Sequence, residues 1–296
     1  MFSAIFGAVA PVFLVALVGF AWAKSGAAPD LKPMTPFIMD IASPCLVFVS
    51  LATLQIPVAE LGVAALAALV SFIAMGALAI PLLARMGLSY RTYGPSLIFP
   101  NNGNLGLPIV LMAFGQTGFS HAMGFFVVMN VASQTLGRAI ASGHGGVKGL
   151  WRAPILPAAA LGVLCAWFQW TPPDWIMRAL TMIGGAAIPA MLIMLGASLA
   201  TMTPHHLGRS FFLSFVRIGG GALLGAAIGF LFGLRGLALD VFILQASMPV
   251  AVVNYGFAFM WGNEPENVAS LIAISTALSV ASIPLLLGVL MALGGA

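Results

Sequence analysis

The chain has 296 residues, of which 61% are hydrophobic and only 6% carry a charge, and its mean hydropathy is +1.10. A soluble domain carries about 25% charged residues, so this composition excludes a soluble protein and indicates an integral membrane protein. The net charge of +4 is small and comes from basic residues scattered among predicted loops, which indicates membrane topology and not a nucleic-acid-binding surface.

Apolar runs of about 20 residues divide the chain, and that is the length that a membrane-spanning helix needs. They do not alternate over about 10 residues, as the strands of a membrane barrel do. The predicted fold is therefore an all-α integral membrane protein with ten transmembrane helices, at residues 4–23, 35–54, 61–83, 93–114, 123–141, 155–170, 176–200, 210–234, 239–261 and 267–293. The first run has no preceding Lys or Arg, so we expect a mature helix and not a secretory signal.

The fourth run is interrupted at residues 99–108, a stretch that is unfit for a regular helix facing lipid. Pro100 and Pro108 each remove a backbone donor and disfavour helix at the residue before them. Gly103 and Gly106 loosen the backbone. Three asparagines add polar groups where hydrocarbon offers no water, namely Asn101, Asn102 and Asn104. Broken backbone at membrane depth is tolerated only where it is buried in protein or lines a wet cavity, so we predict the substrate site of a transporter here.

Ten spans in two sets of five suggest an internal repeat. The tetrapeptide Ser-Leu-Ala-Thr ends the second span at 50–53 and the seventh at 198–201, and both spans carry an earlier proline, Pro44 and Pro189. The fourth helix of each half is interrupted, the ninth near residues 247–249, and matched broken helices point to a transporter binding site. Because each half has five helices, the second half must enter the membrane from the opposite side, so the repeats are predicted to be inverted. The predicted units are residues 1–141, a cytoplasmic linker at 142–154, and residues 155–296.

Basic residues predict the orientation of the chain. Those in odd-numbered loops are Lys24, Lys32, Arg85, Arg91, Arg138, Lys148, Arg152 and Arg209. Only Arg178 and Arg235 fall on the other side. Because basic residues in short loops stay in the cytoplasm, both termini are predicted to be periplasmic or extracellular. Arg217 lies about 8 residues into the eighth helix, and we expect its side chain to extend back to the cytoplasmic face.

The sequence resembles a known family in three of its stretches. Residues 100–108 look like the fourth-helix signature of the auxin efflux carrier family. Residues 245–249 with 253–258 look like its ninth-helix partner in bacterial members, and 278–285 is similar to its last helix. The resemblance implies a scaffold and a transport domain, with helices 4 and 9 crossing at their breaks beside an anionic substrate. Bacterial members include carriers proposed for malonate and similar carboxylates, and the more distant bile acid/sodium symporter family shares the fold.

Physical reasoning gives the same kind of site. Each break exposes a half-helix N-terminus with free amides and a partial positive charge, which suits a carboxylate. The predicted substrate-binding residues are Asn101, Asn102, Gly103, Asn104, Pro108, Asn130, Pro249 and Asn254. Other interpretations of the asparagines remain open. Their carbonyls could equally hold a cation, or the asparagines of the breaks could serve only to satisfy the broken backbone. Asn130 shares one helix face with Gln134, and this face could instead join two helices by hydrogen bonds.

Two residues are candidates for coupling to a proton or an ion, Asp40 and Gln134. An acid inside a membrane helix is functional by default, although Asp40 could instead lie at the interface and pair with Lys32. Neither break contains an acid, so a sodium ion would rely on neutral oxygens. Proton coupling or transport down a gradient is at least as well supported, and sodium-coupled symport is the alternative.

An intramembrane enzyme and a channel are the rival classes. The sequence lacks a His-Glu-x-x-His motif, a nucleophile elbow and a pair of membrane acids, and it places all four histidines in loops, so no metal and no cofactor are expected. A pair of broken helices argues for alternating access and not for a channel. The expected protein is a carrier of a small organic anion in a bacterial-type inner membrane. Its partners are that substrate and lipid, with a homodimer left open.

Overall fold

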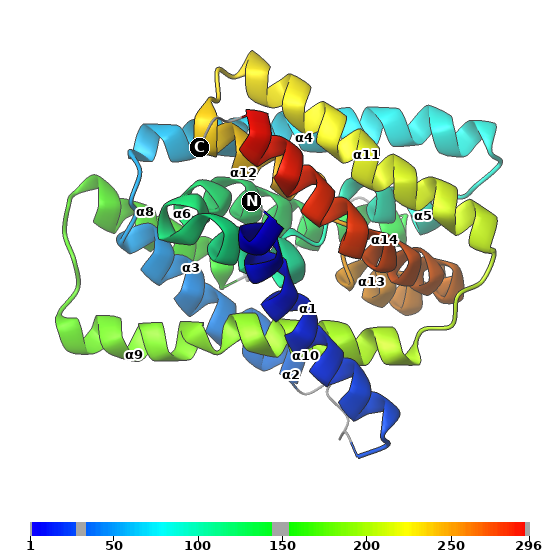
Figure 1. Cartoon of the computed structure of the whole chain (residues 1–296), viewed down its shortest axis with the longest axis horizontal. Helices are drawn as coiled ribbons and strands as arrows, with labels where there is room; N and C mark the ends of the chain where they lie inside the picture. Colours follow the sequence, from blue (N-terminus) through cyan, green and yellow to red (C-terminus); the bar gives the residue numbers. More distant parts are fainter. Residues whose placement is uncertain (1, 28–33, 144–153, 294–296) are drawn as a thin grey trace.

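The computed structural model describes residues 2–27, 34–143 and 154–293, and every structural statement below concerns these residues (Figure 1). The predicted linker at 142–154 falls mostly outside them. They form helices and no strand. The first half contains α1 (Phe2–Lys24), α2 (Met34–Pro36), the π-helical η1 (Phe37–Ala42), α3 (Ser43–Ala52), α4 (Val58–Arg85), α5 (Tyr90–Ile98), the π-helical η2 (Asn102–Gly106), α6 (Leu107–Ala132), the π-helical η3 (Ser133–Gly137) and α7 (Arg138–Ser142).

The second half repeats this plan with fewer interruptions. It contains α8 (Ile155–Trp167), α9 (Asp174–Gly185), α10 (Ala187–Thr201), α11 (Leu207–Leu231), α12 (Gly236–Ala246), α13 (Val253–Trp261) and α14 (Pro265–Leu293). The predicted seventh helix is divided at Ala186, and Pro189 lies in the first turn of α10, where a missing backbone donor does little harm. Both predicted breaks are present, after α5 and after α12.

Seven stretches of the described chain are long and apolar enough to cross a membrane. The longest, Asn102–Ser142, bends sharply at Gly115, whose φ of 63° and ψ of −160° are not helical. α8 and α12 are apolar but shorter. The chain is thus a multi-pass helical membrane protein, whereas the count of ten spans stays a prediction.

The fifth helix begins earlier than predicted, directly after the bend at Gly115. Two polar residues at the start of this helix bond to the α3–α4 connection: Thr117 donates to Gln55 Oε1 at 2.9 Å, and Ser120 Oγ accepts the Gln55 N–H at 3.3 Å. His121 was predicted in a loop, and this was wrong: it lies in α6, with Nδ1 3.9 Å from Glu60 Oε2.

Helices from the two halves pack in matching pairs. α1 crosses α10 closely (Figure 1), because Gly19 and Gly196 let each backbone touch the other helix. α8 packs on α3 in the corresponding way, with Gly162 against the backbone of Phe48. The first helix of each half therefore packs on the second helix of the other half, as expected for two repeats.

A second group of helices surrounds the breaks, whereas α9 packs on α3. α4 packs against α5 and α6, and α11 packs against α12 and α14, while α4 and α11 run side by side (Figure 1). Gly221, Gly225 and Gly229 of α11 face α12, so glycines at every fourth position let these two helices pack closely. Gly233 continues the same spacing, but it lies just after the end of α11 and has a positive φ of 73°.

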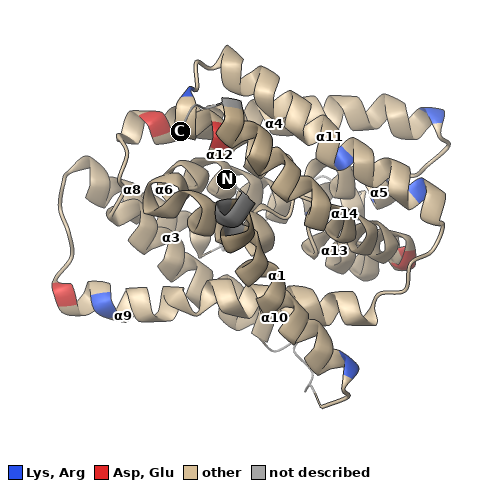
Figure 2. Ribbon diagram, viewed as in Figure 1, with Lys and Arg blue, Asp and Glu red and all other residues tan. Residues whose placement is uncertain are grey.

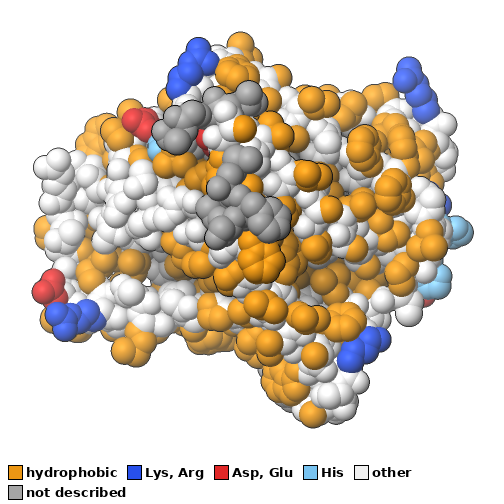
Figure 3. Space-filling model, viewed as in Figure 1, with side chains coloured by type: hydrophobic (Ala, Val, Ile, Leu, Met, Phe, Trp, Pro, Cys, Tyr) orange, Lys and Arg blue, Asp and Glu red, His pale blue; other side chains and the backbone are white. Residues whose placement is uncertain are grey.

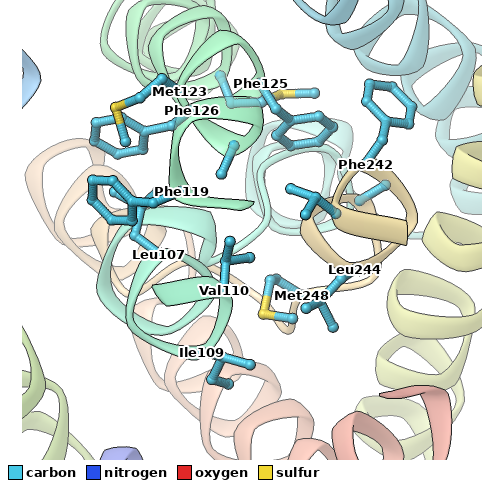
Figure 4. Packing of buried hydrophobic residues seen from close by; sticks show 14 of the residues in the cluster. Leu107, Ile109, Val110, Phe119, Met123, Phe125, Phe126, Phe242, Leu244 and Met248 are labelled. Carbon is cyan, nitrogen blue, oxygen red and sulfur yellow. The ribbon is translucent and has the colours of Figure 1, made fainter. Parts of the chain in front are cut away.

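Buried hydrophobic residues of α6 and α12 fill the space between these two helices (Figure 4). Phe125 and Phe242 meet edge to face, with ring centroids 5.3 Å apart. Charged residues are few and lie mostly near helix ends (Figure 2), and hydrophobic side chains cover much of the face drawn in Figure 3. This distribution suits a protein surrounded by lipid.

Candidate functional site

The two breaks cross and pair with each other through their backbones. Pro100 lies opposite Val250 in an isolated antiparallel bridge. The Asn101 N–H donates to Pro249 O at 2.7 Å, and the Ala251 N–H donates to Phe99 O at 3.2 Å. Each break thus satisfies backbone groups that the other leaves free, as broken backbone within a membrane requires.

Two side chains hold the second break in place. Ser275 of α14 accepts the Val250 N–H at 3.1 Å, and the Asn254 Nδ2 donates to Phe99 O at 3.5 Å. Asn254 is buried and contacts the backbone of the first break, so its amide group supports the crossing. For this residue the geometry favours the alternative in which an asparagine satisfies broken backbone.

Arg217 is the largest difference from the sequence analysis. Its side chain was predicted to extend to the cytoplasmic face, and this was wrong, because only 2% of the residue is exposed. The guanidinium donates to Leu97 O at 2.7 Å, and the same group bonds Ile98 O, Met248 O and Ala246 O. These carbonyls end α5 and α12, so Arg217 caps both half-helices before their breaks.

A cavity of about 790 Å³ lies on the other side of the crossing. Its walls come from the crossing, from η1, α3, α6, η3 and α10, and from the beginnings of α13 and α14. The predicted residues that line it are Asn101, Asn102, Gly103, Asn104, Asn130 and Gln134. Residues that are far apart in the sequence therefore share one cavity, as the crossing of helices 4 and 9 implies.

The other predicted residues do not line this cavity. Pro108 and Pro249 are buried in the packing around the crossing, and Asn254 points at Phe99 O. Asp40 lies in η1, where Ile38 and Met39 line the cavity but Asp40 is exposed. Its alternative partner Lys32 lies outside the described residues. The coupling role of Asp40 stays a prediction.

The polar wall of the cavity carries donors without partners. Among the described residues, the backbone N–H groups of Asn102, Gly103 and Asn104 donate to no protein acceptor, and the same holds for Val252 and Val253. Four buried side-chain groups of the wall also lack a protein partner: Asn101 Nδ2, Asn102 Nδ2, Ser43 Oγ and Ser133 Oγ. Buried polar groups are normally hydrogen-bonded, so this wall is suited to a polar ligand.

Ser43 and Ser133 were not among the predicted site residues. Each directly precedes a residue that drew attention, Pro44 and Gln134 respectively. Helical serines usually bond to their own helix, so the sequence alone offered no reason to prefer them. Ser133 lies in η3, a π-helical segment, and such segments are frequent at functional sites.

Part of the cavity wall is apolar. Five methionines line it, Met39, Met129, Met191, Met194 and Met202, together with the ring of Phe126. A Cβ on Gly103 would lie 2.9 Å from the Phe126 ring, so glycine keeps the first break close to this ring. Methionine side chains adapt to irregular apolar shapes, which suits a ligand with an apolar body.

Formal charge is nearly absent from the cavity. Among the described lining residues, Glu266 at the start of α14 is the one charged side chain, and it is exposed. The deep part of the cavity therefore offers dipoles and amide donors to a ligand.

Broken helices that cross beside an amphipathic cavity, in an all-helical chain with several membrane-length spans, define a membrane transporter of the inverted-repeat class. The family model described as "Membrane transport protein" matches residues 4–147 and again residues 140–287. The chain belongs to this family, the auxin efflux carrier family.

Two curated relatives agree with this membership. An uncharacterized transporter of Methanothermobacter thermautotrophicus is 28% identical over 290 residues, which cover 94% of this chain and 95% of the relative. An uncharacterized transporter of Methanocaldococcus jannaschii is 25% identical over 201 residues, covering 62% of this chain and 63% of the relative. Both names point to transport and not to an enzyme. Both relatives are archaeal, and the bacterial origin of this chain stays a prediction.

Proposed function

We propose that this transporter is a secondary carrier of a small organic anion, which binds in the cavity beside the crossing. One observation carries the proposal. The half-helices that follow the two breaks begin with free backbone amides, and the residues that carry these amides line the same cavity as four buried side-chain groups without a protein partner. Helix N-termini carry a partial positive charge, and a carboxylate satisfies several N–H donors at once.

The charge distribution supports an anion. The guanidinium of Arg217 is buried behind the crossing, and the one acid of the described lining, Glu266, is exposed. Repulsion from Glu266 is therefore weakened by water, whereas the amides act at close range. A cation would instead face unpaired donors at Asn101 and Asn102.

The apolar wall refines the substrate class. A carboxylate on the amide wall leaves the rest of the molecule against Met191, Met194 and Phe126. A second carboxylate would lie against these side chains without a partner, which is unfavourable. We therefore propose a monocarboxylate with an apolar body as the preferred substrate, ahead of a dicarboxylate such as malonate.

Alternating access suits the packing of the two helix groups. The cavity lies between the crossing and α10, so it borders both the group of α1, α3, α8 and α10 and the group that carries the breaks. Movement of the second group against the first would expose the site to either side of the membrane. We propose the inner membrane, with both termini outside and residues 1–141 and 155–296 as the two repeats.

Sodium-coupled symport is the second candidate. Two buried amide oxygens near the crossing, Gln245 Oε1 and Asn254 Oδ1, have no protein partner among the described residues, and neutral oxygens of this kind can bind sodium. Asp40 and Gln134 remain the proposed residues for proton coupling, Gln134 because it lines the cavity.

Ligand-dependent thermal stabilisation of the purified carrier tests the proposal. Mono- and dicarboxylates, including indole acids, are screened at two pH values, with and without sodium. A ligand that binds the folded state raises apparent stability by mass action, so we expect a saturable shift with a monocarboxylate. The shift should vanish in Asn104→Ala and persist in Asn267→Ala, which removes an amide bonded to Glu264 outside the cavity. Stabilisation by no anion would refute the proposed substrate class, and a shift that requires sodium would favour symport.

Uptake into proteoliposomes separates a carrier from a channel. A carrier saturates at low substrate concentration and exchanges labelled for unlabelled substrate across the membrane. Flux that rises linearly with concentration would overturn alternating access.

A further inference from the structure

Arg217 is a buried cation without a buried anion. Its protein partners are four backbone carbonyls, of Leu97, Ile98, Ala246 and Met248. No carboxylate of the described residues forms an ion pair with it. An arginine keeps its charge in proteins, so this region carries one full positive charge that carbonyl dipoles only partly offset.

Such a charge is expensive inside a membrane protein. Removing an ion from water carries a large free-energy penalty, and intramembrane arginines normally pair with an acid or face a water-filled pathway. The capping of α5 and α12 explains the hydrogen bonds of Arg217. It does not explain why a charged residue occupies a site that offers no counter-ion.

The guanidinium lies close to the substrate cavity. A second, small cavity of about 10 Å³ is lined by Arg217, Ser71 and Ala246, and also by Pro100 and Met129. Pro100 and Met129 line the large cavity as well. Arg217 and the substrate cavity therefore lie on opposite sides of a thin wall made by these two residues.

We propose that Arg217 is the counter-charge of the transported anion. Its charge acts on the anion from the other side of the crossing, without direct contact between the two. This inference rests on the proposed function. The residue sets specificity for charge: its field favours a negative ligand at the free amides of Asn102 to Asn104, while its hydrogen bonds hold the two breaks together. Burial removes the water that would screen this field, so it acts over the few residues between Ile98 and Asn102.

The low charge of the cavity lining supports this role. A carrier that placed a basic residue in direct contact with a carboxylate would hold the substrate in a tight ion pair and slow its release. A cation behind the wall attracts the anion more weakly, because the distance between the two charges is greater. Both charges move together if the crossing moves as one body.

Arg209 provides a matched control on the same helix. It lies 8 positions before Arg217 in α11, about 12 Å along the axis. Its guanidinium stacks over the ring of Tyr93, 5.2 Å from the centroid, and it lines neither cavity. Arg209→Gln therefore removes the same charge from the same helix without changing the crossing.

The experiment measures binding of two ligand pairs that are nearly equal in shape, phenylacetate with phenylacetamide and hexanoate with hexanamide. Within each pair the amide lacks the negative charge and carries an NH2 donor in place of one acceptor oxygen, and each variant is compared with the wild type for the same ligand. Purified wild type, Arg217→Gln, Arg217→Lys and Arg209→Gln are compared by calorimetric or thermal-shift titration. We expect Arg217→Gln to weaken carboxylate binding about tenfold or more and to change carboxamide binding less than twofold. Arg217→Lys should keep the carboxylate preference within about threefold, and Arg209→Gln should bind like the wild type.

The outcomes separate this proposal from the proposed function. If the wild type binds neither carboxylate, both fall together. If it binds them and Arg217→Gln weakens carboxylate and carboxamide equally, Arg217 only holds the crossing together and the counter-charge proposal is wrong. If Arg217→Gln does not fold, Arg217→Lys tests the proposal instead. The lysine keeps the positive charge, so loss of the carboxylate preference in a folded Arg217→Lys protein would also overturn the proposal.

Discussion

The two breaks meet at one bridge, yet they offer the cavity different groups. The first break lines it with the side-chain amides of Asn101, Asn102 and Asn104. The second lines it with the methyl groups of Ala251, Val252 and Val253 and with the free backbone amides of the two valines, while the Asn254 amide donates to Phe99 O. The two breaks thus differ, and we infer from this difference that the side chains of the first break recognise the ligand while Asn254 of the second break holds the crossing together.

The largest expected effect comes from filling the space at Gly106, within the first break. A Cβ there would collide with the Gln245 side chain and lie 3.1 Å from Met248 Cγ. Gln245 is fully buried and has little room to move, so Gly106→Ala should destabilise the protein by about 2 kcal/mol through overpacking. The apparent melting temperature of the purified variant measures this.

Gly256, in the half-helix after the second break, is the matched control. A Cβ there meets nothing within 4 Å, so Gly256→Ala should leave stability unchanged or raise it by about 0.5 kcal/mol. Equal destabilisation by both substitutions would show that the two breaks are packed alike, against the structure described above.

A second prediction separates recognition from support. Asn102→Ala should weaken anion binding about tenfold and leave stability unchanged, because the Nδ2 of Asn102 has no protein partner to lose. Asn254→Ala should lower stability by about 1 kcal/mol, since it removes a hydrogen bond to Phe99 O, and should affect binding less. Melting curves and binding titrations of the two variants provide the comparison. The reverse pattern would assign recognition to the second break.

The smallest expected effect lies at the mouth of the cavity. Glu266→Gln removes the one acid of the described lining, so anion affinity should rise by up to about threefold at low salt. The gain should disappear at 1 M salt, where the Debye length is about 3 Å. Titration of a carboxylate at both salt concentrations tests this, and a gain that persists in high salt would place the effect of Glu266 deeper in the cavity.

Sequence reasoning located the first break well, because proline, glycine and asparagine inside an apolar run have a direct physical meaning. Residues 99–108 needed a buried or wet environment, and all three asparagines of this stretch line the cavity. The break near Ser247 to Pro249 was found for the same reason.

The errors have a common physical cause, which is the absence of long-range partners from the sequence. Arg217 lies inside α11, as predicted, but 10 positions after its first residue, Leu207, and the carbonyls of Leu97 and Ala246 that bind it come from two other helices. His121 was assigned to a loop because the fifth span was predicted to begin at residue 123, and the nearby Thr117 and Ser120 bond to Gln55 in a distant connection. Ser43 and Ser133 become notable only because the folded chain leaves them unpartnered beside the cavity.

The bridge between Pro100 and Val250 has a consequence for how the chain is made. The N–H of Asn101 and the carbonyl of Phe99 find their partners on the second break, about half the chain later. While the ribosome is still synthesising the second half, the first five helices must carry these unpaired groups in or near the lipid. Insertion of α12 and α13 is therefore the step that gives these two groups their hydrogen-bond partners. A nascent chain truncated before α12 should leave them unpaired and should be degraded by membrane quality control.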